Sequence, residues 1–138
     1  MRTLLLAVGF VLAFGAIEAK AEVRERLTCP LNKNYAVRIT LERENGSIQR
    51  MLVEEKYFFD SESHPIATLQ RGGRGYVIDY GNVIMMTQDY GRSGYAFVRL
   101  EKKNATEYEA WFDFNLFLNP TSVQTNGALL PVTCYRAR

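Results

Sequence analysis

Apolar and polar residues alternate along much of this chain, and an alternation with a period of two predicts β-strands. The clearest segment runs from Tyr35 to Glu42. Successive side chains of a strand point to opposite faces, so this segment has one apolar face and one polar face. The apolar face carries Tyr35, Val37, Ile39 and Leu41, and the polar face carries Arg38, Thr40 and Glu42. The pattern predicts a strand buried on one side.

A tight turn follows this strand. Asn45 and Gly46 form the residue pair that best accepts the positive φ angles of a two-residue hairpin turn. The segment from Ile48 to Phe59 is again rich in apolar and β-branched residues. We therefore expect it to return as a second strand, antiparallel to the first.

Short strand-like segments separated by turn residues continue to the end of the chain. We predict a polar loop at 60–65, where a proline bars a central strand. The segment 116–123 could hold one short helical turn. The predicted strands are Ile66–Gln70, Tyr76–Tyr80, Val83–Gln88, Tyr95–Glu101, Glu107–Phe114 and Leu129–Tyr135. Such spacing is typical of a sandwich or barrel. The fold class is therefore all-β, a single-domain antiparallel β-sandwich or small β-barrel with about seven to nine strands.

The first 21 residues have the layout of a secretory signal peptide. Arg2 precedes an apolar run from Leu4 to Ile17, and Ala19-Lys20-Ala21 resembles a cleavage site. The run is shorter than the ~20 residues of a membrane span, which makes a retained anchor the weaker alternative. We predict a signal peptide at 1–21 and one exported domain at 22–138, periplasmic or secreted, without a stable membrane span.

Charge and cysteine content narrow the class of protein further. Removing Arg2, Glu18 and Lys20 from the 17 basic and 15 acidic residues leaves a net charge of +1, which argues against a nucleic-acid binder. The two cysteines, Cys29 and Cys134, lie near the two ends of the mature chain. In an oxidising compartment they predict one disulfide, and zinc ligation is disfavoured because neither has a partner at zinc spacing.

Two glycine-containing turns provide the best candidate binding residues. One spans Arg71–Gly75 and the other Asp89–Gly94. Guanidinium groups and exposed main-chain N–H groups bind anions, and tyrosine with arginine is the composition of interface hot spots. The predicted binding residues are Arg71, Arg74, Tyr76, Tyr90, Arg92 and Tyr95. Alternatively, the arginines are simply solvated and the tyrosines fill strand faces.

Evidence for catalysis is weak. His64 is the only histidine, and its acidic and hydroxyl neighbours all lie in one short loop, whereas a catalytic triad assembles across a fold. We predict a solvated loop there, no catalytic residue and no metal or cofactor. Trp111 lies on the polar face of its strand, and we favour a second buried layer over an exposed anchor. Asn45 and Asn104 match the glycan acceptor pattern, which matters only in a eukaryotic secretory route.

These features favour a noncatalytic exported binding module, such as an inhibitor or envelope adaptor, that recognises a protein or an anionic envelope component. The alternatives are a small-molecule carrier with an apolar barrel interior, using Phe97, Phe112 and Phe114, and an envelope hydrolase. The plan of signal peptide, β-rich body and one terminal disulfide is similar in outline to small exported bacterial lysozyme inhibitors and other periplasmic β-barrels. A likeness of architecture does not itself assign function.

Overall fold

The computed structural model of the protein describes residues 22–116 and 131–138. The predicted signal peptide at 1–21 and nearly all of the predicted turn at 116–123 lie outside the described residues. The described elements are β1 (Glu22–Asn32), β2 (Tyr35–Glu44), β3 (Ser47–Tyr57), β4 (Ser63–Gln70), β5 (Gly75–Asp79), β6 (Val83–Asp89), the 3-10 turn η2 (Gly91–Ser93), β7 (Gly94–Lys102), β8 (Glu107–Leu116) and β9 (Val132–Arg136).

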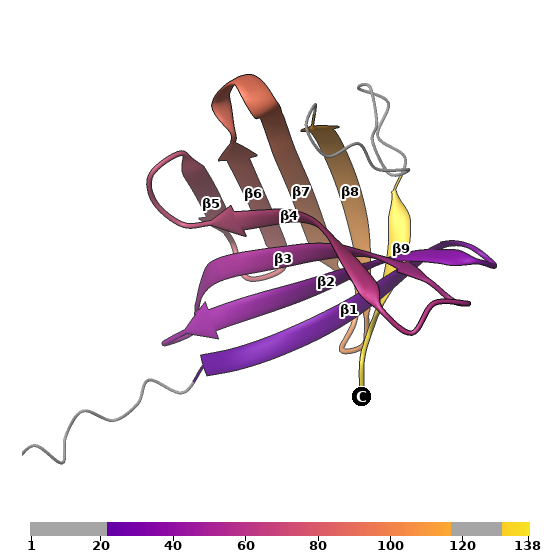
Figure 1. The fold of residues 1–138 in the computed structure, drawn as a ribbon. Helices are drawn as coiled ribbons and strands as arrows, with labels where there is room; N and C mark the ends of the chain where they lie inside the picture. Colours follow the sequence, from indigo (N-terminus) through magenta and orange to yellow (C-terminus); the bar gives the residue numbers. More distant parts are fainter. Residues whose placement is uncertain (1–21, 117–130) are drawn as a thin grey trace, which may run out of the picture.

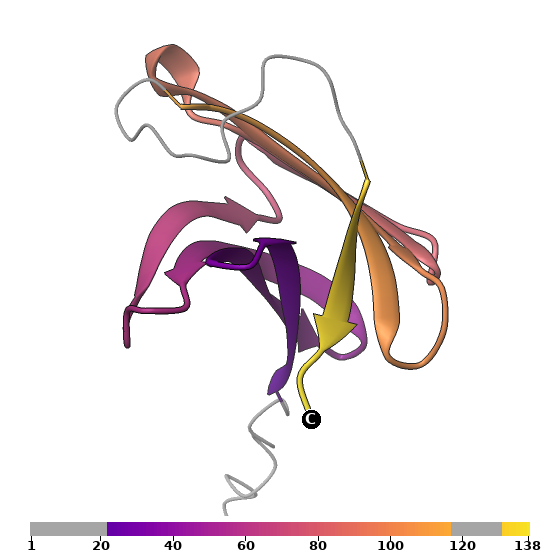
Figure 2. The same ribbon diagram turned by 90° about the vertical axis from the view of Figure 1, so that its right-hand side faces the viewer.

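All of these strands belong to one antiparallel sheet with the order β4-β3-β2-β1-β9-β8-β7-β6-β5. The sheet folds over itself, so that β1–β4 run across β5–β8 (Figure 1), and the two layers join along β1 and β9 (Figure 2). The edge strands β4 and β5 approach each other on the opposite side. The result is a nearly closed barrel, which confirms the predicted all-β class.

The hairpin between β2 and β3 forms as the sequence predicts. Asn45 and Gly46 adopt φ angles of 52° and 81°, the left-handed values that a two-residue turn needs. The register runs from Tyr35 opposite Tyr57 to Glu44 opposite Ser47.

The first strand, β1, does not appear in the prediction from the sequence. Leu27 and Cys29 face the interior and are fully buried, but the next inward position towards the N-terminus is Glu25. This carboxylate interrupts the apolar alternation on which the prediction depends. Hydrogen bonds from Arg43 and Tyr108 make the burial of this carboxylate possible.

Strand β4 begins at Ser63, three residues earlier than predicted, and it includes Pro65. The register shifts between Val53 and Glu54 of β3, so a bulge accommodates the proline. Because β4 is an edge strand, Pro65 needs no main-chain donor on its open side.

The space between the layers is filled by apolar side chains from both. The largest of those that are almost fully buried include Phe114, Leu27, Ile39, Leu41, Ile48, Met51, Leu69, Ile84, Met86 and Leu100. Phe112 and Phe114 stack with ring centroids 5.7 Å apart. Each such side chain contributes about 1.5–3 kcal/mol on burial, so this interior is the main source of stability.

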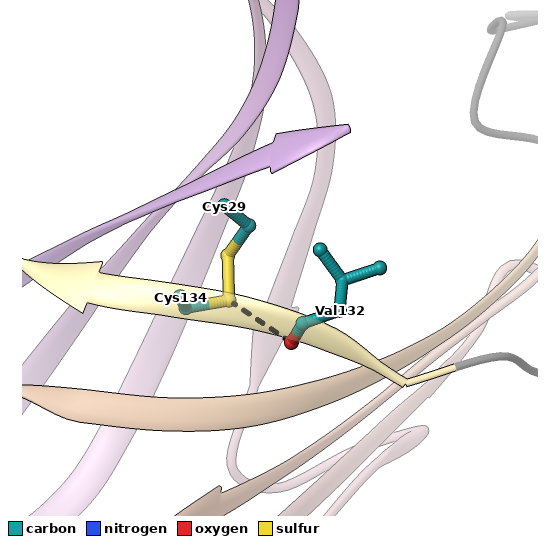
Figure 3. The surroundings of a disulfide bond; sticks show 3 residues. All are labelled: Cys29, Val132 and Cys134. Carbon is teal, nitrogen blue, oxygen red and sulfur yellow. Dashed lines mark hydrogen bonds between the residues drawn. A yellow bond between two sulfur atoms is a disulfide. The ribbon is translucent and has the colours of Figure 1, made fainter. Parts of the chain in front are cut away.

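The predicted disulfide is present between Cys29 of β1 and Cys134 of β9 (Figure 3). The Cα atoms are 4.0 Å apart, and the two cysteines are separated by 105 residues in sequence. The neighbouring pairs Leu27–Arg136 and Thr28–Tyr135 place Cys29 directly opposite Cys134. Figure 3 also marks a 3.9 Å approach of Cys134 Sγ to the Val132 carbonyl oxygen. A disulfide sulfur has no proton to donate, so this approach is a contact and not a hydrogen bond.

Side chains, not main-chain pairing, bridge the seam between β4 and the β5–β6 hairpin. The Tyr90 hydroxyl donates to the Thr68 carbonyl oxygen at 2.6 Å and accepts from the Thr68 N–H at 3.2 Å. Gln88 Oε1 accepts from the Gln70 N–H at 3.0 Å. These bonds satisfy main-chain groups that a neighbouring strand would otherwise pair.

Replacement of both Cys29 and Cys134 by serine should destabilise the protein by about 3–5 kcal/mol, because closing a loop of ~100 residues restricts the unfolded chain by that amount. Chemical denaturation of the double variant beside the oxidised parent measures the loss. A midpoint that does not move on substitution would contradict a stabilising role for the disulfide.

The Tyr90→Phe variant should lose about 1–2 kcal/mol, since the N–H and carbonyl of Thr68 would lose a partner at the seam. Tyr76→Phe is the matched control, because that tyrosine is 71% exposed and the change should cost almost nothing. Denaturant unfolding and faster amide exchange at Thr68 are the measurements. Equal stability of the two variants would show that the hydroxyl does not hold the seam.

Candidate functional site

The two glycine-containing turns lie side by side. The first joins β4 to β5, and the second, which contains η2, joins β6 to β7. The Asp89 N–H donates to the Arg74 carbonyl oxygen at 3.1 Å. A Cβ atom on Gly91 would lie 2.8 Å from Nη1 of Arg74, so the guanidinium packs directly over this glycine. Both turns therefore occupy the same end of the β5–β8 layer.

The three predicted arginines of these turns are all exposed, but they are not equivalent. Arg71 donates from Nε to the Ile48 carbonyl oxygen at 3.0 Å, and its N–H donates to the Gln49 carbonyl oxygen at 2.9 Å. Arg71 therefore also braces the end of β4 against β3. Arg74 and Arg92 lie on the turns themselves.

The three predicted tyrosines have different environments. Tyr76 and Tyr95 are 71% and 42% exposed, and the Tyr95 hydroxyl donates to Asp113 Oδ2 at 3.0 Å. This hydrogen bond raises the pKa of Tyr95, so its hydroxyl stays protonated at neutral pH. Tyr90 is half-buried, and its hydroxyl serves the seam. Tyr76 and Tyr95 are thus available at the surface, whereas Tyr90 supports the structure.

The exposed tyrosines belong to a larger surface, the outer face of β5–β8, which the sequence analysis did not identify. Strand registers align Tyr76 with Thr87 and Phe97 across three strands. The apolar side chains of this outer face are partly exposed to solvent, although the opposite face of the same strands covers the interior. They belong to Ile78, Val83, Met85, Phe97 and Trp111. A sheet with apolar residues on both faces is typical of strands covered on both sides.

Trp111 lies on this outer face, so its predicted place in a buried layer is wrong. The ring is partly exposed, and the Arg99 guanidinium carbon lies 4.4 Å from its centroid. Arg99 and Trp111 are directly opposite in β7 and β8, which explains the stacking. A cation–π contact of this kind attracts the guanidinium to the face of the indole ring.

One sequence signal for this face exists. Val83-Ile84-Met85-Met86 is a continuous apolar run, and Tyr95-Ala96-Phe97-Val98 in the neighbouring strand is another. Ile84 and Met86 are buried in the interior, and Val83 and Met85 lie on the outer face. A continuous apolar run predicts a strand that is buried on both faces. Here only the inner face of the strand is buried, against the interior of the barrel.

His64, in the predicted solvated loop, pairs with the side chain of Asp60. Its Nε2 lies 2.9 Å from Asp60 Oδ2, and both side chains are substantially exposed. The bond to Asp60 raises the pKa of His64, and hydrogen bonds from the Glu62 N–H and His64 lower the pKa of Asp60. The pair is fully charged only between these two pKa values. Its attraction is lost as pH rises through that of His64 or falls through that of Asp60.

The residues predicted to line a carrier cavity do not lie together. Phe112 and Phe114 are buried within the packed interior, and Phe97 lies on the outer face. A separate hollow of about 600 Å³ opens at the loop end of β1–β3, where the rings of Tyr35, Tyr57 and Phe59 follow one another at 4.9 and 5.4 Å.

Residues 22–116 and 131–138 contain no cluster of three or more His, Cys, Asp and Glu side chains suited to a metal ion. The helical structure in the same residues is too short and too polar to cross a membrane. Comparison of the chain with family models, with curated proteins and with solved structures finds no match. The geometry of the site is therefore the basis for a functional proposal.

The pKa of His64 should lie above 6.5 in the folded protein and return towards 6.5 in the Asp60→Asn variant. His64 is the only histidine, so its imidazole NMR signals titrate without overlap. His64→Ala should leave the thermal midpoint nearly unchanged, because exposed ion pairs contribute little. Loss of function in a folded His64→Ala variant would revive the hydrolase interpretation.

Proposed function

We propose that the protein is a noncatalytic, exported binding module that holds a protein partner against the outer face of β5–β8. The observation that carries this proposal is the apolar surface around Phe97, Met85 and Trp111, which no other described residue covers, on a layer whose inner face is already packed. Water-exposed apolar patches of this kind mark interaction sites on soluble proteins.

The border of this face indicates the chemistry of the partner. Arg74 and Arg92 lie at the turns next to Tyr76 and Tyr95, and the Arg99 guanidinium covers Trp111. Protein interfaces combine an aromatic, apolar centre with a polar rim, and arginine and tyrosine are over-represented among their energetic hot spots. The partner should therefore present apolar side chains surrounded by Asp or Glu.

Export is supported by two features. The N-terminal 21 residues match a signal peptide, and the disulfide joins strands near both ends of the mature domain. Disulfides of this structural kind persist in oxidising compartments such as the periplasm or the extracellular space. An inhibitor or an envelope adaptor fits these features equally well.

The carrier alternative has less support. Phe112 and Phe114 stack on each other inside the packed interior, where they contribute to the core. The hollow beside Phe59 is within the ~300–1,000 Å³ size range of small-ligand pockets, but it lies at the loop end of the barrel and Phe59 is 83% exposed.

The disulfide-bonded protein, immobilised and exposed to the exported fraction of its source, should capture a partner that variants of the face lose. Phe97→Ser should weaken binding at least tenfold, and Arg74→Ala with Arg92→Ala should cost about 2 kcal/mol or more in affinity. Arg71 is omitted from this pair because it also donates to the Ile48 carbonyl. Calorimetric titration with the captured partner gives the values.

The matched control is Lys33→Ala with Lys102→Ala, which removes the same charge from exposed positions away from the two turns. It should bind as the parent does. If all variants bind equally, the face is not the site. Loss with the arginine pair but not with Phe97→Ser would indicate an anionic surface in place of a protein interface.

A further inference from the structure

A second, cationic hollow lies at the opposite layer, beside the N-terminal half of β1. Strand β9 ends at Arg136, opposite Leu27, so β1 continues towards Glu22 beyond the end of its neighbour. A hollow of about 370 Å³ occupies this position. Its lining comprises Arg24, Glu25, Arg26, Thr40, Arg136, Ala137 and Arg138. Four of the seven lining residues are therefore arginines, and Glu25 is the only acidic residue among them.

The negative charge of Glu25 is already balanced by partners inside the barrel. Arg43 Nη1 lies 2.7 Å from Glu25 Oε2, and the Tyr108 hydroxyl donates to Glu25 Oε1 at 2.7 Å. Burial raises the pKa of Glu25, but these hydrogen bonds and the positive charges outweigh it and leave the pKa below its usual value. Glu25 is 8% exposed and stays ionised at neutral pH. It is one of the residues that line the hollow.

Two arginines of the hollow, Arg26 and Arg138, retain binding capacity. Arg136 Nε is 3.6 Å from Glu25, longer than the bonds from Arg43 and Tyr108. Arg24 Nε is 3.5 Å from Glu42, whose two oxygens are held at 2.6 and 2.9 Å by Arg50. The ion pairs between described side chains include neither Arg26 nor Arg138, and both residues are exposed. Excess positive charge remains at the hollow.

We infer that this hollow binds a phosphate or sulfate group, held by Arg26 and Arg138 with Arg24 and Arg136 beside them. Guanidinium groups match such anions with paired hydrogen bonds, and Arg keeps its charge at every relevant pH. Arg24 and Arg26 are held by strand β1, and the Ala137 N–H donates to the Arg26 carbonyl at 2.8 Å, which fixes the C-terminal residues beside them. The site is independent of the outer face of β5–β8.

Calorimetric titration of the disulfide-bonded protein with sodium tripolyphosphate at low salt tests the inference. The parent should bind, and Arg26→Gln with Arg138→Gln should weaken binding at least about tenfold. Lys33→Gln with Lys102→Gln, which removes equal charge from exposed positions outside the hollow, should change affinity less than about twofold. No binding by the parent, or equal losses in both variants, would overturn the inference.

Two further measurements separate the remaining explanations. In the parent, tripolyphosphate should shift the amide NMR signals of Arg26, Thr40 and Ala137; shifts confined to the turns at 71–75 and 89–94 would refute the site.

Vesicles of phosphatidylglycerol with phosphatidylcholine should retain the parent but not the Arg26/Arg138 variant if the phosphate belongs to a lipid headgroup. Tripolyphosphate binding without vesicle binding assigns a soluble phosphate. This variant should still capture the protein partner, so failure here leaves the proposed function intact.

Discussion

The architecture depends on the junction between β1 and β9. Two consecutive registered pairs, Leu27–Arg136 and Thr28–Tyr135, join the β1–β4 layer to the β5–β8 layer, and the Cys29–Cys134 disulfide crosses the same junction. A short ladder between strands from the two ends of a domain is costly in chain entropy, because its closing loop spans almost the whole chain. The covalent link restricts that loop in the unfolded state as well, so a marginal pairing becomes a stable one.

Closure at β1 and β9 leaves a second seam, and the way that seam is bridged determines which surfaces stay open. Tyr90 and Gln88 satisfy main-chain groups of Thr68 and Gln70 without extending the sheet. Strand β5 therefore remains at an edge, and nothing among the described residues covers the outer face of β5–β8. A packed interior on one side and an apolar surface on the other are the conditions under which a sheet can bind a partner without losing its fold.

Buried charge organises the other layer. Glu25 and Glu42 neighbour each other across β1 and β2, yet they point to opposite faces, Glu25 inward and Glu42 outward. Each is surrounded by arginines from other strands, and removing one partner from a buried ion pair is far more costly than its net contribution to stability. These clusters fix the positions of Arg24 and Arg136 at the surface. The same interactions that permit burial of the carboxylates thus also shape the cationic hollow.

Local patterns in the sequence determined the β class, the β2–β3 hairpin and the cysteine pair, because alternation, turn residues and cysteine count act over short distances or need no geometry. Tertiary structure decided the rest. Strand β1 was missed because Glu25 is inward only by virtue of Arg43 and Tyr108, which are distant in sequence. The two turns could be chosen from their residues, but their contact at Arg74 and Gly91 arises from strand pairing. Trp111 was assigned to the correct face of its strand, but the expected second layer over that face is absent from the described residues. Alternation shows that a strand has two faces, and only the packing of the whole sheet decides whether both of them are covered.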